Sequence, residues 1–130
     1  MKDMFCFQCE QTAKGTGCEV SGVCGKTPPV SDLQDKLVGA CIGLAKAVKK
    51  TAATEATDAC IKKALFTTVT NVSFDEESLK IMVDCVDKMK AELDPAATDY
   101  DMAKLWDDNE DIRSLKTLIL LGIKGVAAYA

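Results

Sequence analysis

A chain of 130 residues has room for one domain with a modest core, or for one domain and part of another. Its formal net charge of −4 argues against nucleic acid and anionic membrane surfaces as partners. The chain contains no histidine, which excludes zinc sites that mix cysteine with histidine, any His-ligated metal, and Ser-His-Asp or Cys-His catalysis.

The cysteine content and the absence of long apolar runs indicate the compartment. Residues 1–5 contain no apolar run of signal-peptide length, and the longest strongly apolar stretch, residues 118–123, is far too short to span a bilayer. We therefore predict a cytoplasmic protein in a reducing environment. Seven cysteines, an odd number, indicate metal ligation together with buried thiols rather than a disulfide framework.

The segment 31–94 is predicted to form a three-helix bundle that runs up, down and up, because its apolar residues recur at helical spacing and its connections are short. The first helix is expected to begin at Ser31, since Ser31 and Gln34 have the spacing of a capping box. The second is expected over residues 55–72. The β-branched run 67–72 weakens its end and leaves a strand there as an open alternative.

The third helix has the clearest pattern. It is expected to follow a second capping box, residues 73–76, and to stop at Pro95. Its apolar residues alternate at three and four positions, which predicts one buried seam. The seam consists of Leu79, Met82, Val86, Met89 and Leu93.

After the bundle we predict a linker, residues 95–108, and one more long helix, residues 109–130. A short helix is expected within the linker around Met102, Leu105 and Trp106. After Thr117 the last helix is apolar on nearly every side, the pattern of a helix buried against several others. It reaches the end of the sequence without a cap or a polar tail, so we expect it to be the first helix of a truncated second bundle, cut from a longer parent. The predicted fold class is all-α.

The N-terminal segment, residues 1–30, is a loop rich in cysteine and glycine. Four of the seven cysteines fall within nineteen residues, with the spacing C-x2-C-x8-C-x5-C, at Cys6, Cys9, Cys18 and Cys24. Few large apolar residues accompany them, so something other than a hydrophobic core must fix this loop. An iron–sulfur cluster needs four thiolates and backbone N–H groups aimed at the sulfurs, and glycines permit such wrapping. A four-thiolate zinc site usually brings two C-x2-C pairs, and only one is present. Disulfides or free thiols are the third alternative, and the spacing alone leaves all three open.

The remaining three cysteines lie on or beside the apolar stripes of the predicted helices. Cys41, Cys60 and Cys85 are therefore expected to be buried core thiols rather than ligands. Gly122 and Gly125 are expected to allow close packing of the last helix; no strand precedes them, so they do not form a phosphate-binding loop.

Several segments carry a resemblance to one family. The sequence is similar to the N-terminal part of the hybrid-cluster proteins, which are also called prismane proteins and hydroxylamine reductases. The match begins in the cysteine loop, at residues 4–12 (MFCFQCEQT), 17–18 (GC) and 23–26 (VCGK). It continues through residues 32–35 (DLQD), 65–71 (LFTTVTN), 109–115 (NEDIRSL) and 122–130 (GIKGVAAYA). The connection formed by residues 94–108 is short and diverges from the family pattern.

This resemblance implies that Cys6, Cys9, Cys18 and Cys24 ligate a [4Fe–4S] cluster that air can destroy, since the short spacing resembles the form found in anaerobes. Relatives with another spacing carry a [2Fe–2S] cluster. The family's N-terminal domain is helical, and its cluster relays electrons to a buried hybrid iron–sulfur–oxygen cluster, where hydroxylamine is reduced to ammonia and water. The ligands of that hybrid cluster lie in later domains, so no catalytic residue carries over to this chain.

Two functions of different classes follow. The first is an electron-transfer portion of a hydroxylamine reductase, inactive by itself. The second is a structural or interaction module in which zinc staples a helical bundle. The expected partners are an electron donor protein (ferredoxin-like or an NADH-dependent reductase), the remaining domains of the parent, and a second copy of the chain bound through the last helix.

Overall fold

The computed structural model describes residues 2–9, 11–69 and 72–130, and the fold class is all-α, as predicted. Within these residues there is no strand beyond a single antiparallel bridge between Cys6 and Cys18. The elements, in chain order, are the short 3-10 helix η1 (Ala13–Gly15), α1 (Pro28–Lys50), α2 (Glu55–Thr67), α3 (Glu76–Leu93), α4 (Ala103–Trp106) and α5 (Glu110–Tyr129). None of the described helices is long and apolar enough to cross a membrane.

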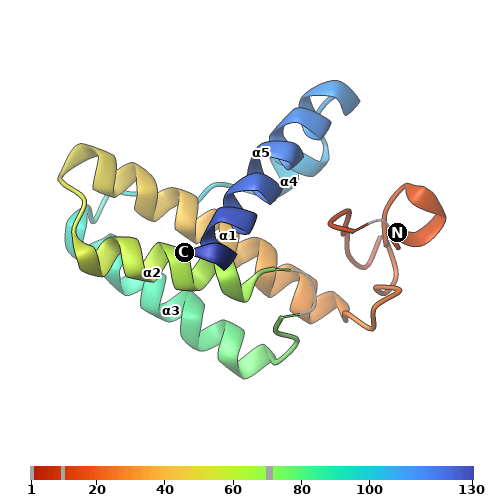
Figure 1. Ribbon diagram of the computed structural model, residues 1–130, viewed down its shortest axis with the longest axis horizontal. Coiled ribbons are helices and arrows are strands. Elements are labelled where there is room, and N and C mark those ends of the chain that lie inside the picture. The colour runs from red at the N-terminus through yellow and green to blue at the C-terminus, as the bar shows by residue number, and fades with distance from the viewer. Residues whose placement is uncertain (1, 10, 70–71) are drawn as a thin grey trace.

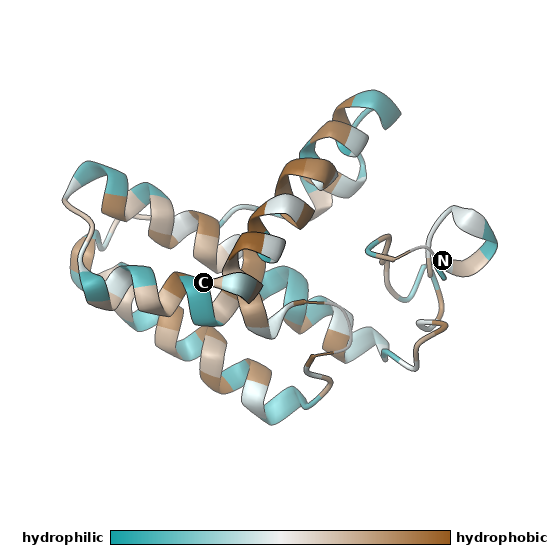
Figure 2. Cartoon of the chain, in the orientation of Figure 1, coloured by the Kyte–Doolittle hydropathy of each residue, from teal (hydrophilic) through white to brown (hydrophobic). Residues whose placement is uncertain are grey.

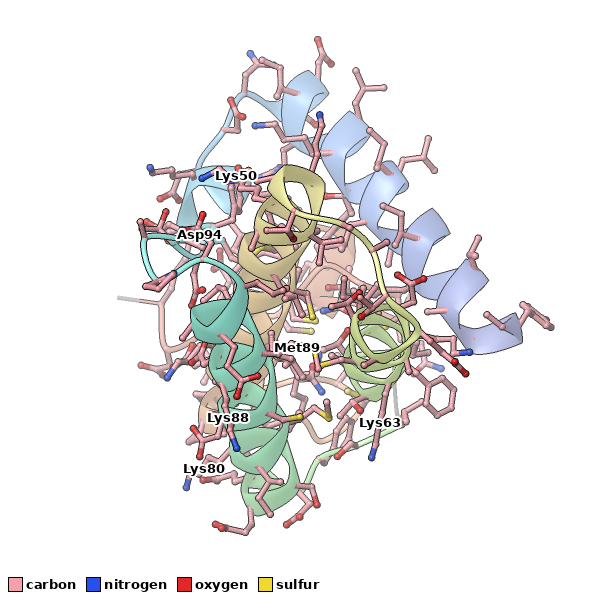
Figure 3. The ribbon with its side chains drawn as sticks, turned by 90° about the vertical axis from the view of Figure 1, so that its left-hand side faces the viewer. Lys50, Lys63, Lys80, Lys88, Met89 and Asp94 are labelled. Carbon is pink, nitrogen blue, oxygen red and sulfur yellow. The ribbon has the colours of Figure 1, made fainter. Side chains whose placement is uncertain are left out.

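Helices α1, α2 and α3 pack against one another in pairs and run up, down and up (Figure 1). Their shared core contains fully buried leucines from two of the three helices, Leu37 and Leu44 of α1 and Leu79 of α3. A 2.9 Å ion pair between Lys50 and Asp94 joins the C-terminal ends of α1 and α3 (Figure 3). The cysteine loop lies outside this bundle, at the N-terminal end of α1 (Figure 1).

The predicted seam of α3 is confirmed. Leu79, Met82 and Val86 are buried in the core, and Met89 and Leu93 pack against it while partly exposed. In Figure 3, Met89 points between the helices of the bundle, whereas the labelled lysines of α3 point outward. The helix ends at Leu93, before Pro95, as expected. The short helix predicted in the linker is also present, as α4.

The predicted start of the first helix is wrong. α1 begins at Pro28, with Thr27 as its N-cap, and Ser31 lies buried inside the helix. The side chain of Gln34 does not reach back to cap the helix; its amide donates to the carbonyl oxygen of Ser73 at 3.0 Å. Proline explains the early start, because its fixed φ suits the first helical turn and its missing N–H would have had no helical partner there.

α2 begins at Glu55, as expected, but its end and the cap of α3 differ from the prediction. α2 starts from a capping box between Thr54 and Thr57, and it ends at Thr67 instead of residue 72. Residues 70–71, inside the predicted end, lie outside the described residues. α3 is capped by Asp75, whose carboxylate accepts the N–H of Ser78 at 2.9 Å, so the box predicted at residues 73–76 is wrong. A carboxylate at this end also interacts favourably with the helix dipole.

The last helix begins where predicted, with Asn109 as its N-cap, and one side of it packs across α2. Its buried residues are few: Thr117, Lys124 and Ala127. Figure 2 shows hydrophobic residues along most of the length of α5, and many of these residues are exposed. These exposed residues are Ile112, Leu115, Leu118, Ile119, Ile123, Val126 and Tyr129. The rest of this chain therefore covers only one side of a helix that is apolar on nearly every side.

Close packing at glycine occurs on α1 rather than on α5. A Cβ at Gly39 would press on the carbonyl oxygen of Tyr100, whose N–H donates to the Gly39 carbonyl at 3.1 Å. A Cβ at Gly43 would lie 2.9 Å from the carbonyl oxygen of Thr98. At Gly122 and Gly125 a Cβ would meet nothing within 4 Å, so the expected role of these two residues is wrong for this chain. The two α1 glycines let the connection after α3 lie directly on α1.

Candidate metal centre

The cysteine loop is held by a short antiparallel contact between its two ends. The N–H of Cys6 donates to the Cys18 carbonyl at 3.0 Å, and the N–H of Cys18 donates to the Cys6 carbonyl at 2.9 Å. The N–H groups of Asp3 and Met4 both donate to the Glu19 carbonyl. Met4, the second of these donors, is buried, with 4% of its surface exposed. The backbone thus places Cys6 and Cys18, the first and third of the four expected ligands, directly opposite each other across this bridge.

The sulfur of Cys18 accepts hydrogen bonds from the turn that precedes it. The N–H of Ala13, in η1, donates to Cys18 Sγ at 3.4 Å, and the hydroxyl of Thr12 lies 3.6 Å from the same sulfur. That hydroxyl also donates to the Cys6 carbonyl at 3.0 Å. The hydrogen bond from Ala13 is the main cause of a lowered pKa of the Cys18 thiol, against an opposing effect of burial. These donors favour the thiolate, which is the form of cysteine that binds metals.

Gly17 is required by the path of the loop. Its φ of +141° is a conformation that residues with a side chain rarely adopt, and a Cβ would lie 2.5 Å from the ring of Phe5. The Phe5 ring packs in turn against that of Trp106, with 5.3 Å between the ring centroids. The loop therefore reaches α4 through one aromatic contact.

A buried lysine of the loop points at a cysteine. Lys26 has 2% of its surface exposed, and its Nζ lies 3.5 Å from Cys6 Sγ. The sequence analysis did not single out Lys26. Its place two residues after Cys24 and inside the similar segment 23–26 were the available signals, and neither indicates burial, because a lysine in a loop is usually solvated.

A second buried lysine reaches the loop from α5. Lys124 has 3% of its surface exposed, and its Nζ donates to Gln8 Oε1 at 3.1 Å and to the Thr68 carbonyl at 3.3 Å. Burial lowers its pKa to about 8, and the nearby Lys26 ammonium acts in the same direction. In the sequence Lys124 lies in the last helix and in the similar segment 122–130, and its distance in sequence from the loop gives no signal of this contact.

One carboxylate belongs to the same buried region. Asp35 of α1 accepts a hydrogen bond from Trp106 Nε1 at 2.9 Å. Burial raises the pKa of Asp35 to about 6, although the indole N–H and the charges of Lys124 and Lys26 oppose this rise. The buried region next to the candidate site therefore contains two ammonium groups and one carboxylate that ionises less readily than usual.

The four expected ligands are not equally placed. Cys18 is buried, whereas Cys6, Cys9 and Cys24 are partly exposed. Within residues 2–9, 11–69 and 72–130, no three cysteine or carboxylate side chains converge closely enough to hold a metal ion. The chemistry of the donor set nevertheless fits an iron–sulfur group: N–H and ammonium donors are aimed at the sulfurs, as an anionic thiolate-bound group requires. Most of these donors would serve a four-thiolate zinc ion as well.

The other three cysteines are free thiols away from the loop. Cys41 and Cys60 are buried, as expected, and burial raises their thiol pKa values to about 12 and about 11. Cys85 is exposed, so the prediction for this residue is wrong. It lies next to the buried seam of α3 but on the flank that turns to solvent, a difference of one helical position that the apolar pattern did not resolve.

Comparison with known proteins identifies relatives of this chain. A family model described as the Prismane/CO dehydrogenase family matches residues 4–130. A protein from Solidesulfovibrio magneticus named hydroxylamine reductase is 43% identical, over 98% of this chain and 29% of the relative. Proteins of the same name from Bacteroides fragilis and Methanocella arvoryzae are 42% and 39% identical, over 97% and 98% of this chain and 28% and 30% of the relatives. The chain thus spans less than a third of the length of these relatives.

Proposed function

Because the chain belongs to the Prismane/CO dehydrogenase family, we propose that it is the iron–sulfur electron-transfer portion of a hydroxylamine reductase. The relatives named above support this assignment, since they match nearly the whole chain. The chain spans about 29% of their length. The reduction of hydroxylamine to ammonia and water is accordingly proposed for the longer protein and not for this segment acting alone.

Cys6, Cys9, Cys18 and Cys24 would hold a [4Fe–4S] cluster in this proposal. Such a cluster supplies reversible one-electron chemistry and needs no bond-making side chains around it. The residues of this chain bind and orient: Ala13 and Thr12 direct hydrogen bonds to Cys18 Sγ, and Lys26 directs its ammonium to Cys6 Sγ. Hydrogen bonds and positive charge at the sulfurs stabilise the thiolate form that iron requires.

The observation that carries the proposal is the pairing of Cys6 with Cys18 beneath donors aimed at both sulfurs. A loop without a bound anion has little reason to bury the ammonium of Lys26 against a thiol, since an unpaired buried charge is unfavourable. No residue of this chain is assigned a catalytic role, because the hybrid cluster implied by the family has no ligand motif here. We propose that the chain alone does not reduce hydroxylamine.

The metal content of protein purified without oxygen tests the proposal. We expect about four irons and four acid-labile sulfides per chain, the stoichiometry of a cubane cluster. Cys9→Ser should reduce both. Cys85→Ser, which changes an exposed thiol on α3, should leave both unchanged. One zinc and no sulfide would instead support a zinc-stapled structural module and would contradict electron transfer.

The partners proposed for this segment follow from the same function. An electron donor protein, ferredoxin-like or an NADH-dependent reductase, would meet the partly exposed side of the loop in the cytoplasm. The exposed apolar side of α5 would be covered by the remaining domains of the longer protein. In their absence it would be covered by a second copy of the chain, because such a patch is unfavourable in water. Sedimentation of the isolated chain as a strict monomer would contradict this last proposal.

A further inference from the structure

Two lysines are buried behind the cysteine loop, although the charge of lysine normally keeps it at the surface. Lys26 has 2% of its surface exposed and Lys124 has 3%. They come from opposite ends of the chain and reach the same stretch of the loop: Lys26 Nζ lies 3.5 Å from Cys6 Sγ, and Lys124 Nζ donates to Gln8 Oε1 at 3.1 Å. The charge of Lys26 also acts to lower the pKa of Lys124. We refer to Lys26 and Lys124 as the buried lysine pair.

In the part of the chain that the structure describes, the neighbours of the buried lysine pair do not fully neutralise it. Among the described residues, neither ammonium forms an ion pair with a carboxylate. Lys124 Nζ is satisfied by two neutral oxygens, Gln8 Oε1 and the Thr68 carbonyl oxygen. Asp35 is the carboxylate that acts on the pair, and its own ionisation is made less favourable by burial. Two desolvated ammonium groups therefore share one carboxylate, whose ionisation burial makes less favourable.

A further source of negative charge beside the pair is the cysteine loop itself. Lys26 Nζ lies 3.5 Å from Cys6 Sγ, and a thiolate at Cys6 would also favour the charged form of Lys124. Two positive charges face the side of the loop where thiolates would carry negative charge. A desolvated surrounding strengthens this interaction, since the Coulomb energy of two charges rises as the effective dielectric constant falls.

We infer that the buried lysine pair sets the reduction potential of the group held by the loop cysteines, by stabilising the negative charge that reduction adds. This inference rests on the proposed electron-transfer function. The charge of the surroundings and the hydrogen bonds to the sulfurs are among the factors that set the potential of an iron–sulfur centre. Each ammonium favours the reduced form over the oxidised form, so removing either one lowers the potential.

A merely structural role gives a different expectation. Lys124 also links α5 to the loop through its hydrogen bond to Gln8, so its loss could disturb the assembly of the loop. In that case the metal content of the variant would fall. If Lys124 acts through its charge, the metal content stays the same and the potential changes.

The test is a redox titration, followed by electron paramagnetic resonance, of the full 130-residue chain reconstituted with iron and sulfide without oxygen. Lys124→Met removes the charge and keeps the length of the side chain. It should lower the one-electron equilibrium constant for reduction at least tenfold, which corresponds to about 59 mV. Lys124→Arg keeps the charge and should retain most of the wild-type potential. The matched control is Lys116→Met, which removes a partly exposed lysine of the same helix, α5; this lysine is paired with Asp108, a residue that precedes the helix.

Lys26→Met is the second variant. It removes the other ammonium while leaving both hydrogen bonds of Lys124 in place, and it should lower the potential in the same direction. An unchanged potential in both Met variants, with wild-type iron and sulfide content, would overturn the inference while leaving electron transfer intact. If neither variant assembled a centre that forms in the wild type, the lysines would act by positioning the loop, and the inference would also fail. If the wild type itself bound no iron and sulfide, the proposed function would fail together with the inference.

Discussion

Replacing Gly17 by alanine should loosen the cysteine loop through two separate effects. The φ of Gly17 is +141°, and a residue with a side chain held in such a region costs about 1–3 kcal/mol. The new Cβ would also lie 2.5 Å from Phe5 Cε2 and 3.0 Å from Phe5 Cζ, so the ring must move. Because this ring packs on Trp106, the movement should disturb the contact between the loop and α4.

The size of the effect follows from the backbone strain. A cost of about 1–3 kcal/mol corresponds to roughly 5–150-fold in an equilibrium constant, and the collision with Phe5 places Gly17→Ala toward the upper end of that range. Gly15→Ala is the matched control. Its φ is +67° and a Cβ there would meet nothing within 4 Å, so it carries backbone strain of about 1–2 kcal/mol and no collision. Since metal binding and the folding of a small site are coupled, the same factors should appear in the affinity for the bound group.

Two measurements check this prediction. Trp106 is the only tryptophan of the chain, so its fluorescence reports directly on the Phe5 contact. Emission should shift in Gly17→Ala and remain unchanged in Gly15→Ala. Competition of the reconstituted proteins with an iron chelator should rank the affinities as wild type, Gly15→Ala and then Gly17→Ala. Wild-type emission and wild-type iron retention in Gly17→Ala would refute the reasoning.

Three further predictions concern the bundle and its titrating groups. Gly39→Ala should lower the free energy of unfolding by about 1–3 kcal/mol through overpacking, whereas the same change at Gly122, exposed on α5, should raise it by up to about 1 kcal/mol; urea titrations that gave one sign for both would contradict this contrast. Iodoacetamide should modify exposed Cys85 well before the buried thiols of Cys41 and Cys60. Mass spectrometry would detect the order of labelling, and faster labelling of either buried thiol would contradict this prediction. The pKa of Asp35 is raised to about 6, so the folded state holds this proton more tightly than the unfolded chain. Ionisation between about pH 4 and pH 6 therefore destabilises the wild type relative to Asp35→Asn, by roughly 1.4 kcal/mol per pH unit, and parallel stability curves of the two proteins would argue against it.

The helices could be predicted because their signals are local. The α3 seam repeats at three and four residues, and this spacing by itself defines the face that turns inward. The ends of the helices were less predictable, because several residues compete to cap each one. The sequence offered Ser31 as a cap, and the prolines before it started the helix earlier. It offered Ser73, and Asp75 provides the cap instead.

In the candidate site, too, features with a local sequence signal could be predicted and features that depend on packing could not. The cysteine spacing and the similarity of the segments around it were enough to indicate the four expected ligands and the family, because these depend on residues close together in the sequence. Whether Cys85 is buried depended on one helical position, and it was decided by how α3 is rotated against its neighbours.

The buried lysine pair was decided by the tertiary structure alone. Lys124 reaches Gln8 only because α5 crosses α2 and its one covered side turns toward the loop. The Gly39–Tyr100 and Trp106–Asp35 contacts likewise join segments far apart in the chain. By itself the sequence determined the helices, the loop and its thiols, since their periodicity and spacing are local. The charges that surround those thiols were decided by packing, because burial and proximity between distant segments exist only after the chain has folded.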